Sequence, residues 1–404
     1  MKNSCCVSVP EILLPQATAD MSKWAVIACD QHTSDPAYWQ ELEEYVKDAP
    51  SALRLTLPEI YLSDDCSDRI AAIARSMRAY REKGIFRKLD KGFVLVERST
   101  PFSPARFGLV LAVDLEAYSY EAGAKAQIKA TEATIVERIP PRLKIRESAS
   151  IEFPHVMLLY DDREDSVLGA LKARRDSLEK LYDFDLNMGG GHIKGYFVPE
   201  SDARSAAQAF SALADEDGVV FMVGDGNHSL ATAKASWEKI KAGLSEEEQK
   251  DHPARFALAE AVNIYDDGIF FEAIHRVVKG VDPEKFAAGI LPEKEGEAFL
   301  VIGGKKRACS FGKDVAGAVK KADAYIAAYT KANGGEADYI HGEEEIVRIT
   351  EEQKDSVGIL LPKMDKSELF AAVKKHGCLP RKTFSMGESA EKRYYIEGKE
   401  IVKI

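Results

Sequence analysis

The chain of 404 residues has a formal net charge of -11 at pH 7, with 45% hydrophobic and 30% charged side chains. This composition is typical of a globular protein with two or three structural units, and it excludes fibrous and disordered chains. The acidic balance argues against binding a nucleic-acid backbone over a broad surface, because such binding depends on many Lys and Arg side chains. No apolar run approaches the roughly 20 residues that span a bilayer, and the six cysteines are scattered, as in a reduced compartment. We therefore expect a cytoplasmic protein with no nucleic-acid or membrane partner.

The first part of the chain predicts several strands and a helix. Residues 24–28 and the segments GFVLVER (92–98) and RFGLVLAVDL (106–115) are strand-like, and residues 67–84 repeat apolar side chains at helical spacing. In residues 142–146, Arg and Lys alternate with Leu and Ile, so a strand there would carry three cations on one face. Such a face would be a local positive field in an acidic protein.

The middle of the chain alternates between strand and helix patterns. The segments HVMLLYDD (155–162), KGYFV (194–198) and GVVFMVG (218–224) predict strands, and residues 167–184 and 203–216 predict helices between them. This alternation predicts an α/β fold of mixed elements, in which a central sheet is flanked by helices.

The C-terminal third continues the alternation from AFLVIGG to the closing RYYIEGKEIVKI. No linker of low complexity marks the boundary between the units, and the seam is expected in residues 280–292. We predict a main α/β unit over residues 1–280 and a smaller C-terminal α/β unit over residues 281–404.

The segment FMVGDGNHSLATAK is the strongest candidate site. An apolar strand leads into Gly224 and Gly226, which permit a sharp turn, and Asn227 is a suitable N-cap for the helix that follows. The N–H groups at the start of such a helix attract phosphates and carboxylates. Asp225 and His228 add an acceptor and a titratable donor on the same turn. The alternative is a capped turn whose polar side chains bond only to the neighbouring backbone.

Two further clusters carry candidate residues. A run of three glycines that includes Gly190 and Gly191 precedes His192 and Lys194, and it predicts either an anion nest or an ordinary flexible turn. The segment KATEAT supplies a cation and a carboxylate for a metal or a general base, and the basic run follows it; the alternative is a solvated charged face. The residues of this second cluster are Lys129, Glu132 and Arg142.

Six blocks of the sequence, in order, resemble the bacterial and archaeal family catalogued as domain of unknown function 1015. The resemblance covers nearly the whole chain. The blocks are WAVIACDQHTSDPAYW, RLKIRESASIEFPHVMLLYDD, LYDFDLNMGGGHIKGYF, VGDGNHSLATAK, DYIHGEE and CLPRKTFSMGESAEKRYYIEG.

The Asp225-Gly226-Asn227-His228 turn also resembles the Asp-Gly-His-His-Arg type motif of the ParB/sulfiredoxin superfamily. That superfamily includes chromosome-partitioning CTPases, sulfiredoxin and an ADP-dependent free-serine kinase, and in it the turn binds nucleotide phosphates. The likeness implies a ParB/sulfiredoxin-like unit and a phosphate site at these four residues. Where the superfamily usually has arginine after the histidine, this sequence has Ser229. The missing cation would then come from Lys194, Lys129 or the Arg142 group.

The resulting hypothesis is an enzyme that binds a nucleotide or another small anionic, phosphorylated metabolite and transfers or hydrolyses a phosphoryl group, as a small-molecule kinase does. Asp225 or Glu132 would act as base or metal ligand, His228 would donate to the developing charge, and Mg²⁺ would accompany the nucleotide. The alternative is a non-catalytic nucleotide or metabolite sensor, or a partner-binding protein, and the sequence leaves a homo-oligomer open. The proposed phosphate-binding residues are Gly224, Gly226, Asn227, Ser229, Gly190, Gly191, His192, Lys194, Lys129 and Arg142.

Overall fold

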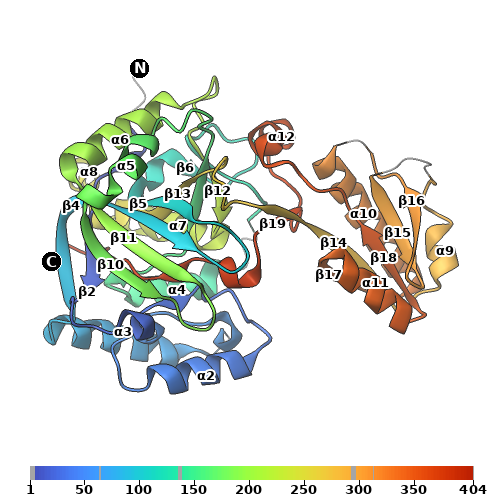
Figure 1. The fold of residues 1–404 in the computed structure, drawn as a ribbon, viewed down its shortest axis with the longest axis horizontal. Coiled ribbons are helices and arrows are strands. Elements are labelled where there is room, and N and C mark those ends of the chain that lie inside the picture. The colour runs from blue at the N-terminus through green and yellow to red at the C-terminus, as the bar shows by residue number, and fades with distance from the viewer. Residues whose placement is uncertain (1–4, 63–64, 135–138, 293–296, 313, 404) are drawn as a thin grey trace. The chain divides into compact units, whose positions relative to one another are not determined.

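The computed structural model describes residues 5–62, 65–134, 139–292, 297–312 and 314–403. The chain divides into two compact units (Figure 1). The larger unit contains Met1–Ile269 and Glu388–Ile404, and the smaller unit contains Phe270–Gly387.

The division differs from the boundary after residue 280 that the sequence predicted. The strand that precedes this boundary belongs to the smaller unit because its hydrogen-bonded neighbours are all strands of that unit. Residues 388–404 return to the larger unit, so the two segments that build it are separated by the whole smaller unit. The strands concerned are β14 (Phe271–Lys279) and its neighbours β17 (Glu336–His341), β18 (Ser356–Leu360) and β19 (Phe384–Met386).

A mixed sheet forms the centre of the larger unit, with eleven strands among the described residues. Three neighbouring pairs are parallel (β12 with β7, β13 with β9, and β6 with β7), and the others are antiparallel. β1 (Val7–Ser8) pairs with β5, and β2 (Glu11–Pro15) pairs with β4. In spatial order the remaining strands are β10 (Glu179–Asp185), β11 (His192–Pro199), β4 (Phe86–Ser99), β5 (Arg106–Asp114), β13 (Phe256–Asn263), β9 (Met157–Tyr160), β12 (Phe221–Asp225), β7 (Ile128–Ala130) and β6 (Tyr118–Ser119).

The central strands bury side chains on both faces, which explains their near-continuous apolar sequences. In β4, Phe93 and Leu95 belong to one hydrophobic cluster, whereas Val94 and Val96 belong to the other. The first cluster includes side chains of α6 (Glu200–Ala212) and α7 (Asn227–Lys241), and the second includes side chains of α2 (Pro36–Val46) and α3 (Ser67–Glu82).

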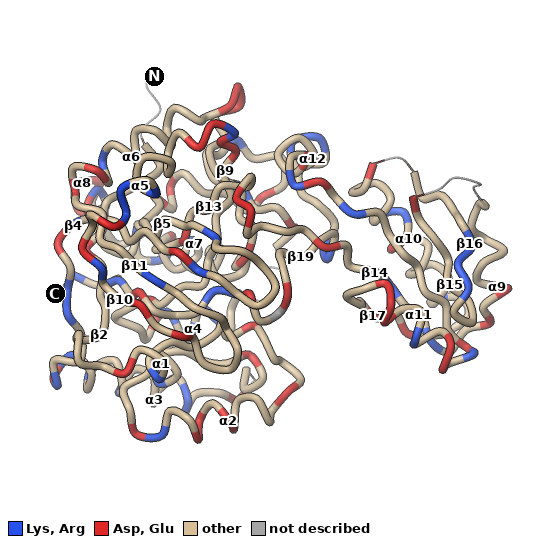
Figure 2. Tube along the Cα trace, viewed as in Figure 1, with Lys and Arg blue, Asp and Glu red and all other residues tan. Residues whose placement is uncertain are grey.

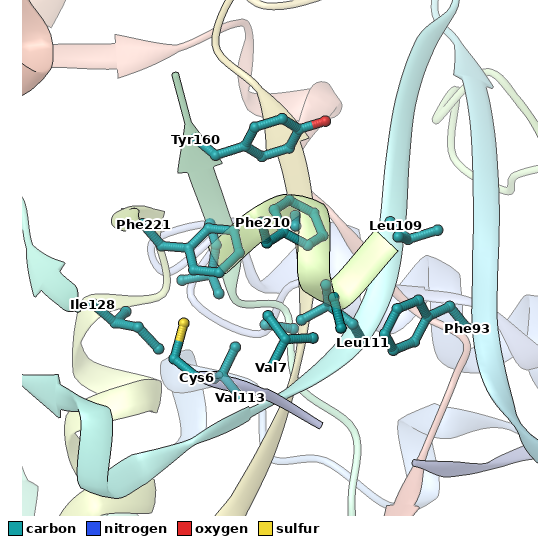
Figure 3. Close-up of a cluster of buried hydrophobic side chains, with 14 of the residues drawn as sticks. Cys6, Val7, Phe93, Leu109, Leu111, Val113, Ile128, Tyr160, Phe210 and Phe221 are labelled. Carbon is teal, nitrogen blue, oxygen red and sulfur yellow. The ribbon is translucent and has the colours of Figure 1, made fainter. Parts of the chain in front are cut away.

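Aromatic rings fill the middle of the first cluster. The ring of Phe210 on α6 lies 4.9 Å from Tyr160 and 5.0 Å from Phe221, measured between centroids. Figure 3 shows these rings together with Leu109 and Leu111 of β5. The predicted α/β fold, with a central sheet flanked by helices, is therefore confirmed.

Two local predictions were wrong. Residues 167–184 form a short helix, α5 (Gly169–Ala173), and then strand β10. The basic run lies on helix α4 (Ile139–Ser148), not on a strand. Arg142 and Arg146 are spaced one helical turn apart, and they pair with Glu59 and Glu152, so the predicted basic strand face does not form.

The smaller unit is built around a second sheet. Its strand order is β16, β15, β18, β14, β17, with β19 also on β14, and buried side chains cover both faces. No helix among the described residues is long and apolar enough to cross a membrane. The elements not yet bounded are β15 (Ala298–Ile302), β16 (Lys305–Cys309), α1 (Met21–Trp24), α8 (Glu246–Lys250), α9 (Pro283–Ala287), α10 (Val315–Asn333), α11 (Glu343–Glu352) and α12 (Leu369–His376).

The C-terminal segment is fixed to the larger unit by two short strand pairs and one buried arginine. β20 (Tyr394–Tyr395) pairs with β3 (Val26–Ile27), and β21 (Lys399–Glu400) pairs with β8 (Ile151–Glu152). The side chain of Arg393 is 5% exposed and lies 2.8 Å from a Glu260 carboxylate oxygen and 2.5 Å from one of Glu397. It also donates to the carbonyls of Pro154 and Tyr394. Three stretches of the chain that are far apart in sequence therefore meet at this guanidinium: the C-terminal segment itself, β13 through Glu260, and Pro154.

Replacing Arg393 by methionine should destabilise the larger unit by about 3–5 kcal/mol, because it leaves the buried Glu397 without its cation and Glu260 with Arg106 alone, at 3.4 Å. The measurement is urea unfolding followed by tryptophan fluorescence, since Trp24, Trp39 and Trp237 all lie in the larger unit.

The matched control is Arg204→Met. Arg204 pairs with Glu200 on the surface of α6, and its side chain is 66% exposed. This variant should unfold at the wild-type urea concentration. Equal midpoints for both variants would contradict a structural role for the buried arginine.

Candidate functional site

The turn between β12 and α7 forms one wall of the candidate site. Gly226 has φ 80° and precedes the first helical residue, and a Cβ there would lie 3.0 Å from the Cα of Val156. Both facts require glycine at this position. Asn227, which the sequence predicted as the N-cap, is instead the first residue of the helix, and no side chain caps it. The start of α7, where the helix dipole is positive, therefore has no side-chain cap on its backbone N–H groups.

Lys392 supplies a cation at this turn. Its Nζ lies 2.7 Å from Oδ1 of Asp225, and the two side chains are 24% and 16% exposed. Burial acts to lower the pKa of Lys392, but the carboxylates of Asp225 and Asp30 outweigh it, Glu132 adds to them, and the pKa is raised. The ammonium is therefore charged at neutral pH. The sequence predicted that Lys194, Lys129 or the Arg142 group would supply this cation.

Asp30 and His155 form an ion pair beside the same turn. Nε2 of His155 lies 3.6 Å from Oδ2 of Asp30, and the histidine side chain is 5% exposed. Burial alone would lower the pKa of His155, but Asp30 raises it, and the net shift is upward. Burial alone would raise the pKa of Asp30, but His155 and Lys392 lower it, and the net shift is downward. Both shifts favour an imidazolium paired with a carboxylate.

Two buried oxygen atoms of the site have no hydrogen-bond donor among the described residues. They are Oδ1 of Asp30 and Oδ1 of Asn227. The amide nitrogen of Asn227 donates weakly to Thr131 Oγ1, at 3.5 Å. Buried acceptors are nearly always satisfied in folded proteins, so these atoms point to a donor that a ligand or water supplies.

A hydroxyl and a thiol contact His155 from its other side. The hydroxyl oxygen of Tyr395 lies 2.8 Å from His155 Nδ1 and accepts from the backbone N–H of Cys29 at 3.0 Å. The same hydroxyl donates to Cys29 Sγ at 2.9 Å. Burial and the adjacent Asp30 raise the pKa of Cys29 to about 12, so its thiol stays protonated.

A cavity of about 160 Å³ adjoins these groups. Its lining includes His155, Cys29 and Tyr395, together with Ser229 from the first turn of α7. An engineered cavity of about 150 Å³ holds one benzene molecule. The space therefore has room for a small group. Its other wall residues include Leu55, Leu57, Met77, Ile145, Phe153 and Leu258, with the Arg142–Glu59 and Arg146–Glu152 pairs.

The glycine-run candidates lie at the β10–β11 hairpin. The carbonyl of Gly190 accepts two hydrogen bonds from Arg98, and a Cβ at this glycine would lie 2.5 Å from the Tyr394 hydroxyl. Close packing thus explains this glycine. The next glycine, Gly191, has a φ of 85°. Its carbonyl accepts a hydrogen bond from the backbone N–H of Leu186.

The basic residues of this hairpin are occupied by carboxylates. His192 lies between Asp183 and Asp185, at 2.8 and 2.7 Å, and Lys194 lies 3.8 Å from Glu97. Figure 2 shows acidic stretches of β10 in red beside β11, which is blue at its one basic stretch. No contact among those described joins this cluster to the Asp225 turn.

The second cluster is divided. Lys129 lies on β7, in register with Met222, and Glu132 follows this strand and acts on the charge of Lys392. Arg142 faces the cavity through its pair with Glu59. Among the described residues, no three His, Cys, Asp or Glu side chains are grouped so as to hold a metal ion.

Sequence reasoning missed Asp30, His155, Lys392 and Tyr395. Each lies in one of the six blocks quoted above, but none follows a recognisable spacing pattern. The available signal was an ionisable residue directly after or before a short apolar run, such as Asp30 after WAVIAC.

Comparisons with known proteins give a family and distant structural likenesses. The family model described as "Protein of unknown function (DUF1015)" matches residues 13–389. No curated protein matches the chain. A free serine kinase in complex with AMP is 12% identical, with a TM-score of 0.42, over 75% of this chain and 95% of that chain.

Two other solved structures are similarly distant. A conserved hypothetical protein from Pyrococcus furiosus is 14% identical, with a TM-score of 0.36, over 69% of this chain and 90% of its own. SbnI with a C-terminal truncation, from Staphylococcus aureus, is 11% identical, with a TM-score of 0.38, over 69% and 82%.

The Asp30–His155 pair should stabilise the protein only in a defined pH range. A raised histidine pKa contributes stability that is complete below 6.5 and is lost as the pH rises through the folded-state value. A lowered aspartate pKa contributes stability that is present above 3.8 and is lost as the pH falls through its folded-state value. The coupling is therefore largest between these two pH values.

A double-mutant cycle of Asp30→Asn and His155→Gln measures this coupling. We expect about 0.5–3 kcal/mol near pH 5.5 and a decrease at alkaline pH, from urea unfolding at each pH. A coupling energy that is constant from pH 5 to 10 would show that the two groups do not form an ion pair.

Proposed function

The chain belongs to the DUF1015 family, whose function is unknown, and we propose from its own site that it binds a phosphorylated small molecule, such as a nucleotide, and transfers a phosphoryl group. The observation that carries the proposal is the Lys392 ammonium, held 2.7 Å from Asp225 at the uncapped start of α7. A cation and a helix N-terminus at one turn are the two elements that proteins combine to hold phosphate.

The phosphate would lie against the first turn of α7. The backbone N–H groups there, including that of Ser229, would donate to its oxygens, and Lys392 would neutralise its charge. Asp225, which the sequence suggested as a base, would instead hold Lys392 in place. His155 would add a second cation beside the phosphate, since its neighbour Val156 packs against Gly226.

Asp30 is the group best suited to receive the proton of the acceptor. Its Oδ1 is buried and has no donor among the described residues, so a hydroxyl of the acceptor would satisfy it. In the reaction, the acceptor oxygen bonds to phosphorus, its proton passes to Asp30, and the bond from phosphorus to the leaving oxygen breaks. A lowered pKa does not prevent this role, because such an aspartate chiefly orients the attacking hydroxyl.

The cavity supports a small acceptor. Its size suits one small group, and both Ser229 and His155 line it. A water molecule in the same place would give hydrolysis, and a hydroxyl-bearing metabolite would give transfer. The free serine kinase complexes with AMP and ADP are too distant to decide between them.

The charge balance supports a ligand that arrives with a divalent cation. Asp30, Asp225 and Glu132 offset Lys392 and His155, so the cluster has no surplus positive charge for a polyphosphate. Nucleotides carry Mg²⁺ on their phosphates, which reduces their charge. We propose that the ligand binds as such a complex.

Binding is tested by thermal shift with AMP, ADP, ATP, sugar phosphates and inorganic phosphate, each with and without Mg²⁺. We expect a rise in melting temperature with at least one of them, because a ligand that binds only the folded state stabilises it. Lys392→Gln should weaken that ligand by about tenfold or more, whereas Lys392→Arg, which keeps the charge, should weaken it less. If no compound in the panel shifts the wild-type protein, the proposed ligand class is wrong.

Turnover is tested by ³¹P NMR with the ligand identified in this way. Asp30→Asn should lower the rate by about 10²–10⁴ while the thermal shift persists, because the phosphate contacts remain. The Arg204→Met protein should react at the wild-type rate. Binding without any product from the wild-type protein would instead support a nucleotide or metabolite sensor.

A further inference from the structure

We propose that Tyr395 and Cys29 are positioning residues that keep the imidazole ring of His155 protonated on both nitrogens. They would do so as a fixed series of hydrogen bonds, from His155 Nδ1 to the Tyr395 oxygen and from the Tyr395 hydroxyl to Cys29 Sγ. This inference rests on the proposed function only for its effect on the reaction. The protonation state of His155 is a property of the ligand-free protein.

The Tyr395 hydroxyl has three polar neighbours and one proton. The backbone N–H of Cys29 can only donate, so it occupies one lone pair of the tyrosine oxygen at 3.0 Å. The tyrosine proton points to Cys29 Sγ at 2.9 Å. The remaining contact, His155 Nδ1 at 2.8 Å, then requires a proton on the nitrogen.

The opposite side of the ring requires a proton as well. Nε2 faces Asp30 Oδ2 at 3.6 Å, and a bare nitrogen lone pair beside a carboxylate would be repelled. Nδ1 therefore donates to Tyr395 and Nε2 points its proton at Asp30. An imidazole ring that donates from both nitrogens is a cation.

The charged groups around His155 come from several elements. Asp30 follows β3, Asp225 ends β12, and both favour the imidazolium. Lys392, just before β20, opposes it. Burial also opposes it, since the ring is 5% exposed. The charge of His155 thus depends on opposing effects of similar kind, and an acceptor at Nδ1 adds to those that favour the imidazolium.

Cys29 decides which way the tyrosine proton points. With Sγ present, the hydroxyl proton has an acceptor other than His155. Without Sγ, the Tyr395 hydroxyl would donate its proton to His155 Nδ1. That hydrogen bond needs a lone pair on Nδ1, which only the neutral imidazole has. Serine at position 29 would restore an acceptor, so alanine should change the protonation of His155 and serine should not.

The consequence for the reaction is an alkaline limit. With His155 as a cation beside the phosphate, activity falls as the pH rises through the pKa of His155. Removing the acceptor for Nδ1 lowers this pKa and moves the limit toward neutral pH. A loss of packing alone would reduce the rate without moving the limit.

The experiment is ¹⁵N and ¹³C NMR of histidine side chains in the ligand-free protein from pH 5 to 10, with His155→Gln to assign the ring. In the wild-type protein, both His155 nitrogens should show the imidazolium shifts at pH 7. In Cys29→Ala and Tyr395→Phe, the His155 pKa should fall by about one unit or more. Cys29→Ala should also show neutral His155 with its proton on Nε2. Cys29→Ser should behave as the wild type does.

Cys66→Ala is the matched control, because Cys66 is a buried thiol of the larger unit that lies outside the lining of this cavity. It should leave the His155 pKa unchanged. The proposal is overturned if Cys29→Ala and Cys29→Ser titrate alike, or if wild-type His155 is neutral at pH 7. If Tyr395→Phe fails to fold, the two Cys29 variants still decide the question.

This measurement needs no ligand, so it remains valid if no phosphorylated compound binds. Conversely, the wild-type protein could bind and turn over a phosphorylated compound while the His155 pKa is the same in the variants. That result would support the proposed function and reject the role of Tyr395 and Cys29. Where turnover is found, the alkaline limit of its pH profile should shift down in Cys29→Ala and return in Cys29→Ser.

Discussion

The buried guanidinium of Arg393 is the interaction on which the site depends. It joins Glu260 of the central sheet to Glu397 of the C-terminal segment, and it fixes that segment against the larger unit. Lys392 directly precedes Arg393, and Tyr395 follows it by two residues. Arg393 therefore helps to position both the side chain that contacts Asp225 and the one that contacts His155. Burying such an ion group is costly unless every partner is present. Loss of either glutamate would therefore weaken the contacts that hold the segment carrying Lys392.

The site is assembled from residues that are far apart along the chain. Asp30, His155, Asp225 and Lys392 come from four separate segments, and the last of them joins the larger unit only after the whole smaller unit. Closing such long loops costs entropy that local contacts cannot repay. The buried side chains of β20, together with Arg393, provide the compensating contacts. The charge of the site is thus complete only when the C-terminal segment is docked on the larger unit.

The sequence predicted the local elements that depend on local patterns. The apolar strand before Asp225, the glycine turn and the helix after it follow from burial and from the conformational freedom of Gly226, and all three are present. Residues 167–184 were mistaken for a helix because Leu and Ala occur there at helical spacing. Tertiary pairing with β11 instead draws their second half into a strand. Likewise Asn227 was a good cap by propensity, yet Gly226 takes that position because Val156 leaves no room for a side chain.

The site itself was only partly predictable, for a different reason. The turn that we propose as an anion site could be predicted because its residues are contiguous. The cation at this turn could not, because Lys392 is separated from Asp225 by 167 positions and no local signal distinguishes it from other lysines. Once the structure supplies this contact, the serine at position 229 has an explanation. A lysine from the C-terminal segment already lies against the carboxylate that begins the turn. Lys392 thus brings to the turn a cation that the residues of the turn do not supply. In this protein the charge of the candidate site is therefore a property of the docked C-terminal segment, and a change that loosens Arg393 would alter the site and the stability together.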